Sequence, residues 1–200
     1  MAAERYIMTG GPELEGRVVE SCQRGDRDAF RQLFEAHKDR VYNVALYFFG
    51  GDDALASDVT QQVFLKLFTR IGQFRRESEF TTWLHRLTVN ACIDEQRQRR
   101  RFQDWETVSP SRVPRTVGAA EERVARHETS DAVREAVAGL KPKLRIAILL
   151  KYFEELSYEE IAVALGCSKG TVASRLNRGH KALARRLGHM REVLLPGGRL

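Results

Sequence analysis

Cysteine is scarce in this chain, and its three copies lie far apart. Cys22, Cys92 and Cys167 form no C-x-x-C pair and belong to no cluster with histidines. That spacing argues against a disulfide framework and against a structural zinc site. We therefore expect each thiol to act as a small buried hydrophobe, since no sequence feature supports a redox role for any of them.

Long apolar runs and strand-like alternation are also missing. Residues 1–16 lack the apolar core of a signal peptide, and no segment approaches the length needed to span a bilayer. No useful stretch of alternating polarity and no internal repeat occurs. We expect an all-α cytoplasmic protein that does not insert into a membrane.

Residue groupings typical of catalysis are absent from the sequence. The acidic residues form no metal-binding set, and neither a Ser/His/Asp arrangement nor a Gly-rich phosphate loop occurs. The histidines are scattered, and ordinary surface or helix positions account for them: His37, His85, His127, His180 and His189. The sequence therefore predicts no enzyme, no catalytic residue, no metal site and no cofactor.

The charge balance is basic. Lys and Arg together number 33 against 27 for Asp and Glu, which gives a formal net charge of +6. A basic balance suits a polyanionic partner such as nucleic acid.

Helical periodicity divides the chain into two small all-α domains. The predicted boundaries are a flexible N-terminus over 1–12, a first domain over 13–102, a flexible linker over 103–127, a second domain over 128–187 and a tail over 188–200. Prolines set among small polar residues mark the linker.

Start and stop signals locate the helices of the first domain. Asp26 is expected to cap a helix that ends at a glycine pair, and Asp52 or Asp53 to start the next. That second helix is expected to bury its apolar residues, Phe68 included, and Ser78 to cap a third helix.

Residues 156–186 predict a helix-turn-helix. Ser157 followed by Glu160 is a capping-box pattern, and Gly166 falls where the chain must turn sharply. Ser168 can cap the second helix, whose apolar residues would pack against the first.

The outward face of that second helix is basic, and the helix has no acidic residue. Arg and Asn side chains can read base edges in the major groove, and Lys can hold phosphates. The alternative is a basic, solvated helix in an all-α domain. The candidate contacts are Lys169, Ser174, Arg175, Asn177, Arg178 and Lys181.

A second basic segment combines arginines with aromatic residues. Phe74, Phe80 and Trp83 lie close in sequence to Arg75 and Arg76, a combination that suits unstacked bases and single-stranded backbone. The alternative is that Phe80 and Trp83 belong to the hydrophobic core.

Four motifs, in chain order, resemble blocks of one protein family. Residues 58–64, DVTQQVF, resemble the region 2.2 pattern D-L-x-Q-E-x-F, and residues 77–86, ESEFTTWLHR, resemble the E-S-x-F-x-T-W-L-x-R block of regions 2.3 and 2.4. Residues 140–162 resemble region 4.1, and residues 170–176 resemble the recognition helix of region 4.2. Over most of residues 13–187, the chain resembles bacterial RNA polymerase sigma factors of the extracytoplasmic-function (ECF) type.

This resemblance implies two helical domains, called region 2 and region 4, that bind core RNA polymerase. The region 2.2 helix would dock on the clamp coiled coil of the largest subunit, and region 4 would meet the polymerase flap. Gln62 stands where the family usually has Glu, which removes a charge but retains a hydrogen-bonding amide. The residues assigned to core binding are Asp58, Gln61, Gln62 and Leu65.

The resemblance also implies that both domains bind promoter DNA. The −35 element would meet the basic helix, with Arg178 as the first choice for a base edge, and Asn90 would read a −10 base. Gly179 would lie at a close approach to DNA or to the flap, or at a tolerated position. The residues assigned to the −10 element are Phe80, Trp83, Arg86, Asn90, Arg97 and Arg100.

An anti-sigma factor that clamps both domains is a further partner that the resemblance implies. The main alternative function is a dimeric helix-turn-helix regulator that binds duplex DNA without polymerase. That alternative gives residues 58–64 and 77–86 no role, and the sequence has no dimerisation heptads. A structural helical adaptor would leave the basic helix unexplained.

Overall fold

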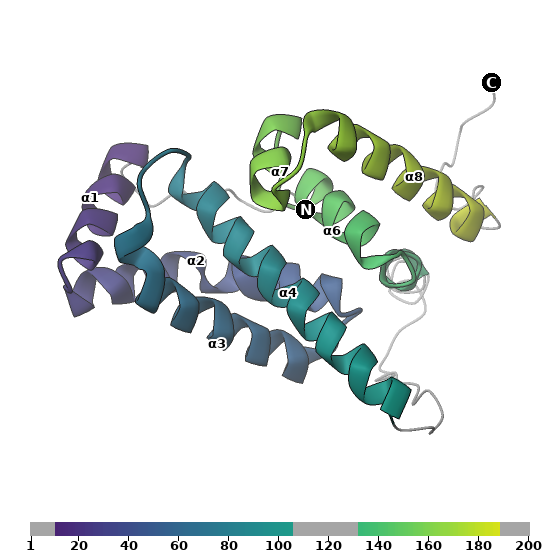
Figure 1. Cartoon of the computed structure of the whole chain (residues 1–200), viewed down its shortest axis with the longest axis horizontal. Helices are drawn as coiled ribbons and strands as arrows, with labels where there is room; N and C mark the ends of the chain where they lie inside the picture. Colours follow the sequence, from purple (N-terminus) through teal and green to yellow (C-terminus); the bar gives the residue numbers. More distant parts are fainter. Residues whose placement is uncertain (1–10, 106–131, 189–200) are drawn as a thin grey trace, which may run out of the picture.

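The computed structural model describes residues 11–105 and 132–188, and within these ranges every regular element is a helix (Figure 1). The first unit contains α1 (Gly11–Gln23), α2 (Arg27–Phe48), α3 (Asp53–Arg70), the 3-10 turn η1 (Ile71–Gln73) and α4 (Phe80–Trp105). The second contains helical residues 132–138, α6 (Pro142–Tyr152), α7 (Tyr158–Leu165) and α8 (Lys169–Leu187). The prediction of an all-α fold is confirmed.

Two described helices extend into segments that the sequence predicts to be flexible. Helix α1 starts at Gly11, inside the expected N-terminal segment, and α4 continues to Trp105, inside the expected linker. The remainder of the linker, residues 1–10 and residues 189–200 lie outside the described residues. Among the described helices, none combines the length and apolar character that crossing a membrane requires.

Local capping explains where the helices of the first unit begin. The Asp26 carboxylate accepts from the backbone N–H of Asp28 at 2.9 Å, and Asp52 accepts from that of Leu55 at 3.1 Å, so α3 starts at Asp53 as expected. Helix α4 begins at Phe80, later than the predicted Ser78 cap would give. The reason is the irregular loop before it, in which Arg76 has a left-handed φ of 58°.

Each unit has its own apolar core. In the first unit, α1, α3 and α4 pack against α2 or against one another, and the fully buried side chains include Leu33, Phe48, Val59, Leu67 and Val89. In the second unit, α6 packs against α7 and α8, and the corresponding residues are Ile146, Leu149, Ile161, Val172 and Leu176. Apolar helix faces buried in this way supply most of the stability of short helices.

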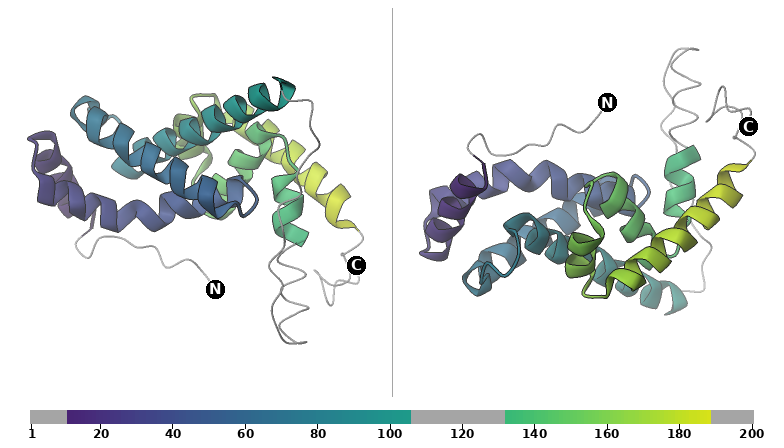
Figure 2. Two further views of the ribbon diagram at one scale, coloured as in Figure 1. Left: turned by 90° about the horizontal axis from the view of Figure 1, so that it is seen from below. Right: turned by 90° about the horizontal axis from the view of Figure 1, so that it is seen from above.

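The two units also pack against each other, α7 on α4 and α6 on α2, as the views in Figure 2 show. Arg145 of α6 is buried at this junction, where its guanidinium donates to the carbonyls of Phe48, Ala138 and Leu140. It thereby satisfies a carbonyl at the end of α2 that the helix itself leaves free.

All three cysteines are free thiols, as the sequence analysis expects. Cys22 and Cys92 are buried, and burial raises their pKa values to about 11 and about 12 respectively. Cys167 is only half-buried because it lies in the turn before α8, so the prediction of a buried thiol is wrong for this residue.

Candidate nucleic-acid interface

The helix-turn-helix forms through contacts between residues close in sequence. The Ser157 hydroxyl accepts from the Glu160 N–H at 3.2 Å, and the Glu160 carboxylate accepts from the Ser157 N–H at 2.7 Å, which completes the predicted capping box. Gly166 turns the chain with a φ of 57°, and Ser168 caps α8 by accepting from the Thr171 N–H at 3.2 Å. These predictions are confirmed.

Packing against α6 fixes the orientation of α8. Val172 and Leu176 are fully buried, as expected, and Gly179 is buried too. A Cβ atom on Gly179 would lie 2.9 Å from Cγ1 of Ile148, closer than normal van der Waals contact. The glycine therefore marks a close approach of α8 to α6 within the protein, which corrects the expectation of an approach to DNA or to the flap.

The opposite face of α8 is exposed and has no carboxylate. Arg175 is half-buried, with Nη1 3.7 Å from Sγ of Cys167, whereas Arg178 lies along the helix and donates from Nε to the Ser174 carbonyl at 3.3 Å. Lys169 pairs with Glu159 of α7 at 2.7 Å. The candidate side chains that are exposed are Lys169, Ser174, Asn177, Arg178 and Lys181.

Helix α3 presents the four residues assigned to core polymerase. Asp58, Gln61, Gln62 and Leu65 are all exposed, Leu65 to 66%. Phe68, expected in the core, is 58% exposed beside Leu65 and contacts the ring of Phe30 edge-on at 5.1 Å. This exposure was not evident from the sequence, because Phe68 directly follows the buried Leu67 and two adjacent apolar residues do not show which of them faces solvent.

Helix α4 begins with an aromatic cluster of Phe74, Phe80 and Trp83. The Phe74 ring centroid lies 5.8 Å from that of Phe80 and 5.4 Å from that of Trp83. Phe80 is 4% exposed, so in this conformation it supports the half-buried Trp83 and offers no surface of its own to DNA. The other residues assigned to the −10 element are exposed: Arg86, Asn90, Arg97 and Arg100.

Three polar residues lie between the two units, in what we call the polar seam: the buried side chains of His85 and Glu154 and the partly exposed Arg40. The Glu154 carboxylate pairs with the Arg40 guanidinium and lies 3.4 Å from Nε2 of His85. Burial, with the nearby charges of Arg40 and His37, lowers the pKa of His85 to about 3. Burial raises the pKa of Glu154, and Arg40 opposes that rise.

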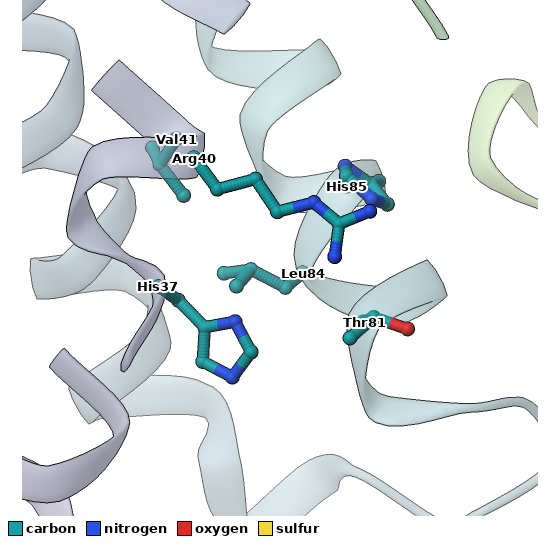
Figure 3. Close-up of a pocket in the computed structure, with 6 residues that line it drawn as sticks. All are labelled: His37, Arg40, Val41, Thr81, Leu84 and His85. Carbon is teal, nitrogen blue, oxygen red and sulfur yellow. The ribbon is translucent and has the colours of Figure 1, made fainter. Parts of the chain in front are cut away.

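Figure 3 shows Arg40 extending beside the His85 ring in a small pocket, with His37 below them; the lining residues are His37, Arg40, Val41, Thr81, Leu84 and His85. His37 and His85 are 3% and 4% exposed, so of the expected surface or helix positions they occupy helix positions, buried on α2 and α4. His37 follows Leu33 and precedes Val41 at four-residue spacing, a signal that places it on the buried stripe of α2.

Within the part of the chain that the structure describes, no three His, Cys, Asp or Glu side chains come together where they could hold a metal ion. What the exposed residues offer is hydrogen bonding and positive charge. The arrangement is therefore suited to binding, through a basic helix on one unit and an aromatic and basic helix on the other.

Comparisons with known proteins agree with this arrangement. Residues 33–102 match the family model for Sigma-70 region 2, and residues 130–183 match that for Sigma-70 region 4. The RNA polymerase sigma-H factor of Pseudomonas aeruginosa is 32% identical over 88% of this chain and 94% of its own length. The ECF RNA polymerase sigma factor SigW of Bacillus subtilis is 30% identical over 84% of this chain and 94% of its own.

Solved structures share the fold. CnrH, in complex with the cytosolic domain of CnrY, matches with a TM-score of 0.64 and 24% identity over 86% of this chain and 96% of its own. The sigma factor RpoE of Bartonella quintana, in complex with the anti-sigma factor NepR, matches with a TM-score of 0.62 and 24% identity over 80% of this chain and 96% of its own. On the fold, the matched regions and the full-length relatives together, the chain belongs to the ECF family of RNA polymerase sigma factors.

Proposed function

We propose that α8 reads the −35 element of a promoter in the major groove. The observation that carries this assignment is the exposed, carboxylate-free face of a helix whose start, turn and rear packing are all specified. Asn177 and Arg178 lie exposed in the middle of this face, where they can donate to base edges. Lys169 and Lys181 lie nearer its ends and suit phosphates.

The outer face of α4 takes the −10 element as the duplex opens. Asn90 has both a donor and an acceptor for a base edge, and it is exposed between the arginines that suit phosphates. Trp83 is half-buried and supported by Phe74 and Phe80, and the exposed part of its ring can stack on an unpaired base.

The exposed face of α3 binds core RNA polymerase. Leu65 and Phe68 form an apolar centre, and Asp58, Gln61 and Gln62 supply polar contacts around it. An apolar centre with a polar rim is the usual composition of a protein interface. A sigma factor needs this surface because it acts by directing core polymerase to promoters.

Both promoter elements can be read at once only if the two units separate. The −10 and −35 elements are separate sites on the duplex, and each base pair between them adds about 3.4 Å of length. Here α7 packs on α4, so the two reading helices belong to units in direct contact. Promoter binding therefore requires the polar seam to open.

An anti-sigma factor is the proposed regulatory partner, and the cytoplasm the proposed location. RpoE of Bartonella quintana, which shares the fold, binds a partner of this kind, the anti-sigma factor NepR. A protein of this kind acts by binding and not as an enzyme, in keeping with the binding surfaces described above. Copurification from the native host, followed by displacement with core polymerase, tests the anti-sigma assignment.

Run-off transcription tests the main proposal. Core polymerase is combined with this protein, or left without it, on a library of promoter fragments. We expect initiation that depends on both components and selects particular −35 and −10 sequences. Failure to bind core, together with tight binding of duplex DNA by a dimer of the protein alone, would instead favour a conventional helix-turn-helix regulator.

A further inference from the structure

The connection between α3 and α4 is held in place by α1, a helix that lies outside the proposed contact surfaces. Gln23 ends α1, and its side-chain amide donates to the carbonyls of Ile71 at 3.0 Å and Phe74 at 2.9 Å. These bonds join residues that are 48 and 51 positions apart in the sequence. One side chain of α1 therefore fixes both ends of the short turn η1.

Arg76 attaches the next part of the connection to the same helix. Its Nη2 donates to the Gly16 carbonyl at 2.9 Å and pairs with Oε1 of Glu20 at 2.6 Å. The backbone of Arg76 has a φ of 58°, a conformation that residues other than glycine keep only when their surroundings impose it. The two contacts with α1 supply that constraint.

The neighbouring arginine has a different environment. Arg75 is exposed, and it makes no hydrogen bond or ion pair with the residues that the structure describes. Of two adjacent arginines, Arg76 is committed to α1 and Arg75 remains available to a partner.

The constrained connection leads directly into the aromatic cluster of α4. The Phe74 carbonyl accepts a hydrogen bond from Gln23, and Phe74 is 8% exposed. The centroid of its ring lies 5.4 Å from that of Trp83. Trp83 is the side chain to which the proposed function assigns stacking on an unpaired base. A shift of the connection would move Phe74 and remove the support behind Trp83.

We infer that Glu20, Gln23 and Arg76 are positioning residues for capture of the −10 element, and that Arg75 is the cation of this connection that contacts the DNA backbone. This inference rests on the proposed function of α4. Four hydrogen bonds with α1 hold the connection in its binding conformation before DNA arrives. Their loss lowers the population of that conformation, and the apparent affinity falls in proportion.

Binding of single-stranded −10 DNA by holoenzyme tests the inference. The probe is the labelled segment that wild-type holoenzyme selects from a randomised single-stranded pool. Because one hydrogen bond contributes about a fivefold factor, we expect about fivefold weaker binding for Arg76→Ala and about tenfold weaker binding for Gln23→Ala. Glu20→Ala should weaken binding only about twofold, because the Glu20–Arg76 pair is exposed and solvent screens it. Gln23→Arg keeps a donor at this position and should recover most of the affinity.

Two readouts separate positioning from direct contact. Arg75→Ala should reduce the slope of log affinity against log salt by about 0.7, the value for one phosphate contact on a single strand, whereas Arg76→Ala should leave the slope unchanged. In a double-mutant cycle, Glu20→Ala should add little to Arg76→Ala, because Arg76→Ala has already removed the pair with Glu20. Arg75→Ala should add its full effect to Glu20→Ala.

Core binding, duplex −35 binding and cooperative thermal unfolding of each variant serve as controls and should be retained. A loss of all of them in parallel with −10 binding would overturn the inference, because the contacts would then only stabilise the fold. Additive effects of Glu20→Ala and Arg76→Ala, with a reduced salt slope for Arg76→Ala, would overturn it in favour of direct DNA contact by Arg76. Wild-type selection of a −10 sequence with unaffected variants would refute this inference alone; no selection by the wild type would refute the proposed function as well.

Discussion

Region 4 and region 2 hold their working surfaces by different means. In region 4, the start of α7 and the start of α8 each depend on side chains that bond three residues along the chain, at Ser157 and Ser168. In region 2, the connection before α4 depends on α1, through partners 48 to 60 residues away. Local bonds make the helix-turn-helix a self-contained unit, whereas the −10 surface depends on the assembled fold.

The polar seam extends this difference, because its partners are the most distant in sequence. Arg40 and Glu154 are 114 residues apart, and the Glu154 side chain is only 6% exposed. The Arg40–Glu154 pair therefore helps to hold region 4 against region 2.

Removing Glu154 should have the largest effect. In Glu154→Ala, the guanidinium of Arg40 loses its buried partner, and we expect a loss of about 2 kcal/mol in the free energy of unfolding, below the usual figure for buried pairs because Arg40 is partly exposed. The contact between the two units should weaken in parallel. Urea unfolding measures the first effect, and an increased radius of gyration by small-angle X-ray scattering measures the second.

The matched control is an exposed, local ion pair. Glu35 and Lys38 on α2 pair at 2.5 Å, three residues apart. Solvent screens such pairs, so Glu35→Ala should change neither measurement. Equal effects of the two substitutions would show that the buried seam has no special role in holding the units together.

Acidification should weaken the same junction through His85. Its pKa of about 3 lies below the ordinary value near 6.5, so the folded protein holds the ring neutral while the unfolded chain takes up a proton. The stabilisation is complete above about pH 6.5 and is lost as the pH falls from there toward 3. Between pH 7.5 and pH 5.5 we expect a loss of about 1.4 kcal/mol.

The pH effect is measured as the difference between two proteins. His85→Gln removes the titrating ring, so its unfolding free energy should fall less than that of the wild type over this pH range. The raised pKa of Glu154 acts in the opposite sense, since it favours the folded state as the carboxylate takes up a proton. Parallel pH profiles for the two proteins would rule out His85 as the cause.

The same division explains which features could be predicted from the sequence. Four helices begin where a capping side chain accepts from a backbone N–H within three residues, at Asp26, Asp52, Ser157 and Ser168. The turn at Gly166 follows from a glycine that adopts a positive φ. Local chemistry determines these features, so the pattern was sufficient. Two of the four family motifs, residues 58–64 and 170–176, lie within such helices, α3 and α8.

Features that depend on tertiary contacts could not be predicted in this way. Nothing near Glu154 in the sequence indicates that it meets Arg40, and nothing near Arg76 indicates that α1 will impose a positive φ. Gly179 was ambiguous for the same reason, because only the packed structure shows Ile148 behind it. His37 is different, since its four-residue spacing from Leu33 and Val41 was available in the sequence.

The smallest expected effect tests whether region 4 depends mainly on bonds between residues that are close in sequence. Ser157→Ala removes the hydroxyl that accepts from the Glu160 N–H, and loss of such a cap costs about 1 kcal/mol of stability. Because the cap serves α7, which orients α8, binding of duplex −35 DNA should weaken with it. Binding of single-stranded −10 DNA should not change, since the contacts that position α4 come from α1.

Urea unfolding and the two binding assays measure these effects, with Ser174→Ala, which removes no cap, as the control for stability. If Ser157→Ala weakened −10 binding as much as −35 binding, the two surfaces would be coupled, and region 4 would not be the self-contained unit that its local bonds indicate.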